Sequence, residues 1–298
     1  MEPASASPSL RVHHPCRSGW TAIAQFALVA FFVGVSLTLF GTLLQPLVNQ
    51  LLHHFGLPPL GLSWWRIFRR CASIAAGISL WVCIRAIEHR SFRWYGFGLL
   101  TAKREFAFGL ALGVTALGSM LAIGLLSGVC RFAITPDGVR LWRTVLLFVP
   151  AAVLVAALEE LVFRGYLLRH LSTLSTPLGV LLTSAAYAAV HVKELSFAAA
   201  GLRELFGLFL LGGVLAVSCI VTRHLALAMG LHAAFAYGAR VNKLVIEFTV
   251  PPGSWFIGTS RLINGVASWI VLLVVGAVVL WWVQSRHRNR GGLGYEQA

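Results

Sequence analysis

Apolar residues run along this chain in eight stretches that short polar segments separate. Two of them, 178–192 and 224–239, are shorter than the roughly 20 residues of a usual membrane span, which suits helices that line a cavity. The pattern predicts an all-α fold: a polytopic integral membrane bundle of about eight transmembrane helices. The predicted helices are 21–47, 66–87, 106–130, one that begins near Trp142, 178–192, 205–222, 224–239 and 262–284.

Two acidic residues interrupt the fourth stretch. Glu159 and Glu160 follow fifteen uncharged residues, 144–158, and are two of only ten acidic residues in the chain. A charge at membrane depth costs roughly 2.5–3.5 kcal/mol on insertion scales and therefore indicates function. On a helix, Glu160 and Arg164 form an i, i+4 pair, whereas Glu159 points about 100° away. The alternative is a pair of interfacial acids whose side chains extend from a helix end towards the headgroups.

Composition agrees with membrane insertion. The chain is 58% hydrophobic and 11% charged, less than half the charged fraction of an average soluble domain. The net charge of +14 comes from basic residues scattered between apolar runs, where they face anionic headgroups, so we expect no nucleic-acid partner. The five cysteines are far apart and form no CxxC pair, which argues against a disulfide framework or a cysteine zinc site.

A single transmembrane domain, 20–284, is predicted between two tails. Residues 1–19 are predicted to be a short, disordered basic tail, and 285–298 a basic C-terminal tail. Because 1–19 lack the apolar core of a signal peptide, we expect the first span to stay in the mature protein. A slight excess of Lys and Arg on the side that carries both termini favours cytoplasmic termini.

Depth within the bundle connects Glu159 with two histidines. The turn near Ser175 lies 16 residues after Glu159 and 16 before His191, which places both about 24 Å from it. His232 lies 8 residues past His224, about 12 Å along its helix, and can reach the same layer. The sequence thus predicts a buried polar site.

Two chemistries fit these residue types. In the first, Glu159 is a general base that activates water with the help of His191, and His232 donates to the developing oxyanion of a peptide carbonyl. In the second, Glu159, His191 and His232 bind a divalent metal such as zinc, with a position left open for water. The sequence leaves the choice open.

The histidines also have simpler interpretations. His191 adjoins Lys193 and can be interfacial, and the small neighbours of His232 allow close helix packing. Tyr187, one turn before His191, either packs or bonds to the site. The other histidines lie near predicted span ends and are expected to be solvated: His13, His14, His53, His54, His89, His170, His224 and His287.

The order of these residues resembles the CPBP family of intramembrane proteases, which includes the type II prenyl-protein CAAX endopeptidase and the bacterial abortive-infection-like proteins. The family pattern is EExxxR, F-xxx-H and H-xxx-N on successive helices. The matching residues are Glu159-Glu160-xxx-Arg164, Tyr187-xxx-His191 and His232-xxx-Ala236. Their order and spacing cover about 142–240, which the resemblance implies to be the catalytic core.

The resemblance implies an intramembrane endopeptidase. We expect no cofactor, with a divalent metal such as zinc as the alternative. Glu159 would be the water-activating base, His191 its partner, Glu160 with Arg164 a structural and electrostatic pair, and His232 part of the oxyanion hole. The expected partners are a membrane-associated protein or peptide substrate and the lipid bilayer. We expect a multi-pass protein of a bacterial-type cytoplasmic membrane. The substrate is a CAAX-type prenylated tail or another processed peptide, and the sequence does not select between them.

Two positions depart from the family pattern. Tyr187 in place of Phe is a mild change. Ala236 stands where the family often has Asn, a second oxyanion donor, and such a loss costs about 10²–10³ in rate. The main alternative is therefore a catalytically silent membrane scaffold or binding protein on the same fold. A proton-coupled transporter is a further alternative, although no inverted repeat is visible in the sequence.

Overall fold

The computed structural model describes residues 19–98, 102–191, 199–249, 254–258 and 261–292. Its long helices are α1 (Gly19–His54), α2 (Trp64–Trp81), α3 (Lys103–Leu126), α4 (Gly138–Glu160), α6 (Thr176–His191), α7 (Ala199–Thr222), α8 (Ala226–Val245) and α10 (Val266–Gly292). The short elements are the π-helices η1 (Val82–Ile87) and η3 (Leu161–Leu167), the 3-10 helix η2 (Phe92–Tyr95), α5 (Leu168–Leu171), α9 (Ser254–Ile257), β1 (Cys130–Phe132) and β2 (Ile246–Phe248).

Six helical segments of the described chain are long and apolar enough to cross a membrane. They are 19–54, 70–87, 103–126, 138–171, 199–222 and 266–286. Helix α6, with 16 residues, and α8, with 20, are not among the six. The predicted all-α polytopic bundle is confirmed, whereas the count of eight spans stays a prediction.

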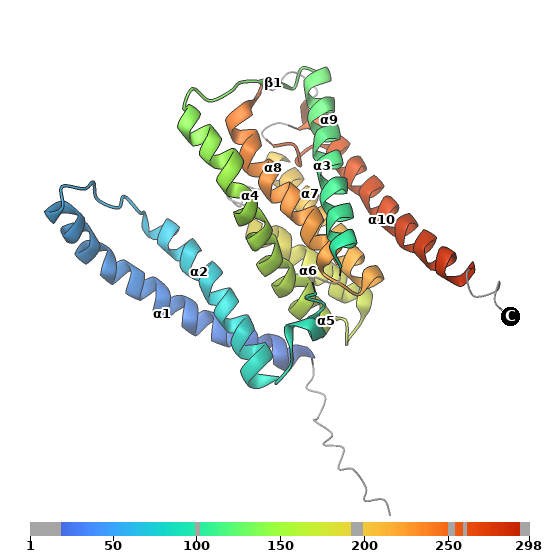
Figure 1. Cartoon of the computed structure of the whole chain (residues 1–298), viewed down its shortest axis with the longest axis horizontal. Helices are drawn as coiled ribbons and strands as arrows, with labels where there is room; N and C mark the ends of the chain where they lie inside the picture. The colour runs from blue at the N-terminus through green and yellow to red at the C-terminus, as the bar shows by residue number, and fades with distance from the viewer. Residues whose placement is uncertain (1–18, 99–101, 192–198, 250–253, 259–260, 293–298) are drawn as a thin grey trace, which may run out of the picture.

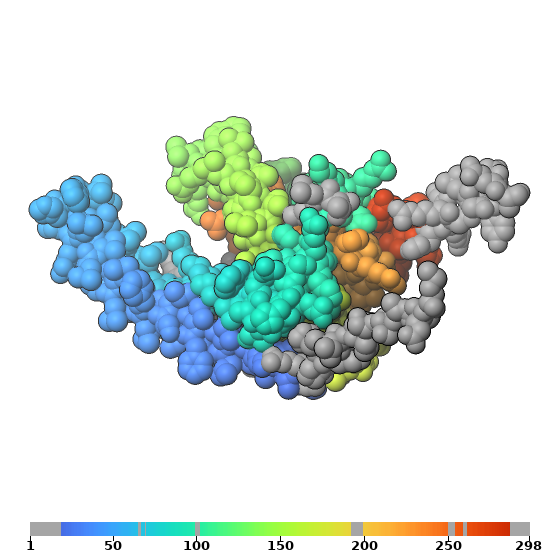
Figure 2. Space-filling view, turned by 60° about the horizontal axis from the view of Figure 1, so that its bottom comes forward, coloured from blue at the N-terminus to red at the C-terminus, as the bar shows by residue number. Residues whose placement is uncertain are grey.

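Helices α1 and α2 form a hairpin that leans away from the other helices (Figure 1). Only four residues of α1 are buried, three of them in its first turns: Gly19, Ala22 and Phe26. Phe26 packs against Tyr166 of η3, with ring centroids 5.4 Å apart, so the hairpin joins the bundle at its base. Figure 2 shows the hairpin in blue as an arm at one side of the molecule.

Helix α8 lies at the centre of the bundle. All ten residues from Ala226 to Phe235 are buried, and α8 packs most extensively against α3 and α4. Two glycines allow the backbones of α3 and α8 to approach closely. A Cβ at Gly109 would overlap the Leu227 carbonyl oxygen, and one at Gly230 would overlap the carbonyl oxygen of Phe106. Small residues at such crossings are the usual means of close helix packing in membranes.

Replacing Gly230 with Ala should destabilise the bundle. The added methyl group has no space against α3, so we expect a loss of about 1–3 kcal/mol in the free energy of unfolding, measured in detergent. Gly118→Ala on α3 is the matched control, because its Cβ would meet nothing within 4 Å and should add roughly 0.5–1 kcal/mol through helix propensity. Equal stability of the two variants would contradict the packing described.

Two short strands close one end of the bundle. β1 pairs antiparallel with β2, with Cys130 opposite Phe248 and an exposed ion pair of 2.7 Å between Arg131 and Glu247. The prediction of a helix up to residue 130 is therefore wrong at its end. Helix α3 ends at Leu126 because the chain turns at Gly128, whose φ of 71° lies outside the range of a right-handed helix.

Several helix ends, and the burial of one histidine, differ from expectation. Helix α1 continues to His54 rather than 47, α7 begins at Ala199 rather than 205, and α8 ends at Val245 rather than 239. Helix α10 continues to Gly292, beyond the predicted end of the last span at residue 284. His170 is not solvated as predicted: its side chain is 14% exposed, and Nε2 lies 3.2 Å from Oε1 of Glu88. The residue is covered because α5 packs under the segment between α2 and α3. Tyr95 and Tyr166 also bond to the Glu88 carboxylate there.

The remaining expectations concern the other histidines, the cysteines and the N-terminal tail. His53, His54, His89 and His224 are exposed, as predicted. Four of the five cysteines are described, and all four are free. The predicted disordered tail, with Cys16, His13 and His14, lies outside the described residues, as does the side chain of His287.

Candidate active site

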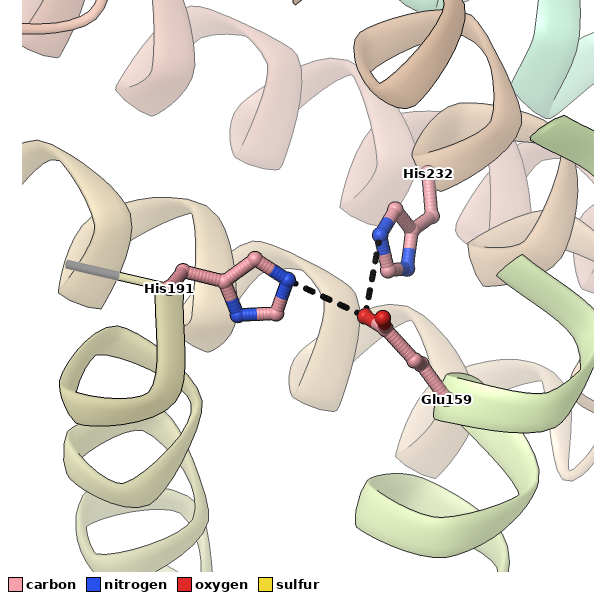
Figure 3. Close-up of side chains that lie close together, drawn as sticks. All are labelled: Glu159, His191 and His232. Carbon is pink, nitrogen blue, oxygen red and sulfur yellow. Dashed lines mark ion pairs between the residues drawn. The ribbon is translucent and has the colours of Figure 1, made fainter. Parts of the chain in front are cut away.

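Three side chains from three helices meet inside the bundle (Figure 3). Glu159 lies at the end of α4, His191 is the last residue of α6, and His232 lies in the buried half of α8. Oε2 of Glu159 is 3.0 Å from Nε2 of His191 and 3.6 Å from Nε2 of His232. The depth match predicted from the turn near Ser175 therefore does bring Glu159 and His191 into contact.

Each imidazole ring is oriented by a hydrogen bond at Nδ1, the ring nitrogen that does not face Glu159. Nδ1 of His191 lies 2.8 Å from the carbonyl oxygen of Tyr187, which only accepts hydrogen bonds, so Nδ1 carries the proton. Nδ1 of His232 lies 2.7 Å from Oε1 of Glu160, and we assign its proton in the same way. In the neutral rings, both Nε2 lone pairs then face Glu159. Three acceptors around one point attract a proton, a water hydrogen or a cation.

Glu160 and Arg164 form a buried ion pair beside this group. Nη1 of Arg164 donates to Oε1 of Glu160 at 2.8 Å, and both side chains are 0% exposed. Nη2 of Arg164 donates to the Gly212 carbonyl oxygen of α7 at 3.0 Å. The pair therefore links α4, α7 and, through Glu160, the His232 ring of α8. Arg164 belongs to η3, and π-helical turns of this kind are frequent at functional sites.

Tyr187 holds the two histidines in place. Its hydroxyl lies 3.4 Å from Nε2 of His232, and its ring packs on His191 with centroids 4.1 Å apart. The guanidinium carbon of Arg164 lies 4.6 Å from the centre of the same ring. Tyr187 is buried, and it both packs and bonds. The sequence left these two interpretations open.

Exposure differs across the site. The side chains of Glu159 and His191 are 27% and 26% exposed, whereas that of His232 is 4% exposed. Glu159 and His191 therefore lie on the more open side of the site and His232 on its closed side, while Oε2 of Glu159, the atom between the histidines, is buried. Ala236 lies one turn after His232, is half-buried, and offers no side-chain hydrogen bond.

The three central residues also fit a divalent metal. One ligand atom from each of Glu159, His191 and His232 lies within 4.8 Å of the others. A tetrahedral ion with bonds of about 2.1 Å holds its ligand atoms roughly 3.4 Å apart, close to the two separations from Glu159. The hydrogen bonds behind each Nδ1 are also those that orient metal-bound histidines. The same three side chains thus serve either chemistry.

One structural partner was missed from the sequence. The Gly212 carbonyl oxygen accepts from Arg164, and a Cβ at Gly212 would lie 3.0 Å from Cα of Ser184. The only available signal was the Gly212-Gly213 pair in an apolar run, which marks close helix approach without naming a partner.

Comparison with known families gives one match, over the part of the chain that carries these residues. Residues 141–238 match the family described as type II CAAX prenyl endopeptidase Rce1-like. This part of the chain belongs to the Rce1-like family. The match confirms the predicted membership of the CPBP proteases, and it covers the three helices that carry Glu159, His191 and His232. No curated protein matches the chain.

The match to the Rce1-like family indicates the general activity and the membrane setting of the protein. It places the chain among membrane proteases in general and implies a membrane-associated peptide substrate in a lipid bilayer. The apolar helices agree with a multi-pass membrane protein. The matched range, 141–238, is close to the catalytic core of about 142–240 predicted from the sequence.

Proposed function

We propose that this protein is an intramembrane endopeptidase that hydrolyses a peptide bond with a water molecule activated by Glu159. The observation that carries the proposal is the convergence of Glu159 Oε2 with Nε2 of His191 and Nε2 of His232, at 3.0 and 3.6 Å. A carboxylate beside two imidazoles is the residue set of general acid–base catalysis.

The roles follow from the contacts. Glu159 takes a proton from water as the water oxygen attacks the carbonyl carbon, and His191 holds the carboxylate and the water in place. As an imidazolium, His232 donates from Nδ1 to Glu160 and from Nε2 to the oxyanion. When the carbon–nitrogen bond breaks, Glu159 returns the proton to the leaving amine. Glu160 and Arg164 orient His232 and do not touch the substrate.

The substrate in this proposal is a membrane-associated protein or peptide. A CAAX-type C-terminal tail is the class that the family description suggests, and another processed tail would meet the same chemistry. The protein would act in a bacterial-type cytoplasmic membrane with both termini in the cytoplasm. Ala236 removes one donor from the oxyanion site, and this is the residue that supports a silent scaffold on the same fold.

A metal-dependent form of the same hydrolysis is favoured by one observation, the donor geometry of Glu159, His191 and His232. These residues would hold the ion, and the ion would supply a Lewis acid and an acidic bound water. Glu160 and the Tyr187 carbonyl would orient the two histidines in this case as well.

Metal removal tests the two forms. The wild-type protein in proteoliposomes would be incubated with a library of membrane-tethered tail peptides, with and without a chelator. With Glu159 as the base, we expect the cleavage rate to change by less than about twofold, because no step needs an ion. Loss of cleavage on chelation, with recovery on adding zinc, would instead make the three residues ligands.

A further inference from the structure

A second polar cavity lies at the end of the bundle where α5 meets the turn between α7 and α8. It has a volume of about 260 Å³ and is lined by residues 95–96, by Arg164 and residues that follow it up to Ser172, and by residues 219–225 at the turn between α7 and α8. Its cationic side chains come from Arg169, Arg223 and His224, and from Arg164, whose charge is paired with Glu160. None of the described residues that line it is acidic.

Aromatic and apolar groups complete this basic cavity. Tyr95 and Ser172 bring hydroxyl groups, and Leu168, Ile220 and Leu225 form apolar walls. Trp94, in the adjoining turn η2, lies under two guanidinium groups, those of Arg169 at 3.4 Å and Arg90 at 5.0 Å from the ring centre. Figure 2 brings this end of the molecule forward, with the segment that contains η2 in teal at its centre.

The nearby acid Glu88 acts on Arg169 only through its charge and forms no ion pair with the described arginines of the cavity. Its carboxylate bonds to the hydroxyl groups of Tyr95 and Tyr166 and lies 3.2 Å from His170. Arg169 donates instead to the Trp94 carbonyl oxygen, at 2.5 Å. Arg223 and His224 form no side-chain ion pair with any described residue. The cavity therefore keeps its positive charge.

Arg223 also holds a costly backbone conformation. Its φ of 59° is one of two positive values among the described non-glycine residues. Glycine adopts this conformation freely, whereas a residue with a Cβ pays about 1–2 kcal/mol. A side chain kept at such a position agrees with a role for the guanidinium group in the cavity.

We propose that this basic cavity binds the phosphate of an anionic membrane lipid. Guanidinium groups bind phosphate oxygens through charge-assisted, often paired hydrogen bonds. Basic pockets between the ends of membrane helices suit lipid headgroups, and the apolar walls formed by Leu168, Ile220 and Leu225 suit the glycerol and first acyl carbons. Free phosphate can form the same hydrogen bonds as the headgroup phosphate, but it has no apolar part to pack against these walls.

Lipid titration of the purified full chain tests the proposal. Native mass spectrometry in detergent would count bound short-chain phosphatidylglycerol, phosphatidylcholine or inorganic phosphate on the wild type, Arg223→Gln and Arg223→Gly. We expect phosphatidylglycerol to bind at least about tenfold more weakly to both variants, as loss of one charged hydrogen bond predicts. Arg140→Gln, an exposed arginine at the other end of α4, is the matched control and should bind like the wild type.

The glycine variant separates binding from folding. Arg223→Gly relieves the backbone cost, so its thermal unfolding temperature should equal or exceed that of the wild type while its lipid binding falls. Unchanged phosphatidylglycerol affinity in both variants, or an equal loss in Arg140→Gln, would overturn the proposal. Equal affinity for phosphatidylcholine would also overturn it. Inorganic phosphate binding as tightly as the lipid would assign the cavity to free phosphate instead.

Discussion

Glu159→Gln should abolish peptide cleavage while leaving the fold intact. Glutamine keeps the size of the side chain and its place 3.0 Å from His191, but it cannot accept the proton of the attacking water. We expect kcat/KM to fall by about 10³-fold or more, within the range of general-base removal. The measurement is cleavage of membrane-tethered tail peptides in proteoliposomes, together with the thermal unfolding temperature of each protein.

The same substitution at a surface acid is the control. Glu247 carries an exposed ion pair with Arg131 in the two-stranded sheet, so Glu247→Gln removes one negative charge at the end of the bundle, 15 residues beyond His232 along the chain. Its cleavage rate should stay within about twofold of the wild type, since such pairs contribute little. If Glu159→Gln kept a tenth or more of the activity, the carboxylate would not be the base.

Arg164→Met should cause the largest loss of stability. The substitution leaves the Glu160 carboxylate buried without its 2.8 Å partner and removes the hydrogen bond to the Gly212 carbonyl oxygen. Breaking a buried ion pair from one side costs about 3–5 kcal/mol, because the remaining charge stays desolvated. Equilibrium unfolding in detergent measures the change.

A double variant shows whether the loss comes from the unpaired charge. Glu160→Gln combined with Arg164→Met removes both charges and should regain at least about half of the lost free energy. Arg131→Met, which breaks an exposed pair, should cost roughly 0–1 kcal/mol. A double variant as unstable as Arg164→Met alone would show that the charge of Glu160 is not the cause.

The sequence was sufficient to predict much of the site because membranes restrict polar residues. A carboxylate within an apolar run is costly in free energy at membrane depth, so Glu159 and Glu160 could be recognised as candidate site residues from the sequence alone. The depth argument succeeded for His191 because helix rise is constant along a chain. The i, i+4 spacing predicted the pair of Glu160 and Arg164 even though Arg164 lies in a π-helical turn.

Other features depend on contacts that sequence does not encode locally. His170 was expected in solvent, but its partner Glu88 comes from the segment after α2, 82 residues earlier in the chain. The two-stranded sheet pairs segments 116 residues apart in the chain, and three-residue strands carry too short a pattern to be predicted. The bond from His232 to Glu160 depends on how closely α8 approaches α4, which the sequence does not state.

The π-helical turn η3 has a consequence for how this protein can lose its activity during evolution. A π-helical turn holds one residue more than an α-helical turn, so the chain can lose a residue within Leu161–Leu167 and return to ordinary i, i+4 bonding. Loss of Leu161, Val162 or Phe163 would move Arg164 to i+3 from Glu160. Loss of a residue from the middle of α8 would instead rotate one half of that helix against the other by about 100° and disrupt its packing. A deletion of one codon in η3 is thus a short route from an active protease to an inactive relative with the same fold.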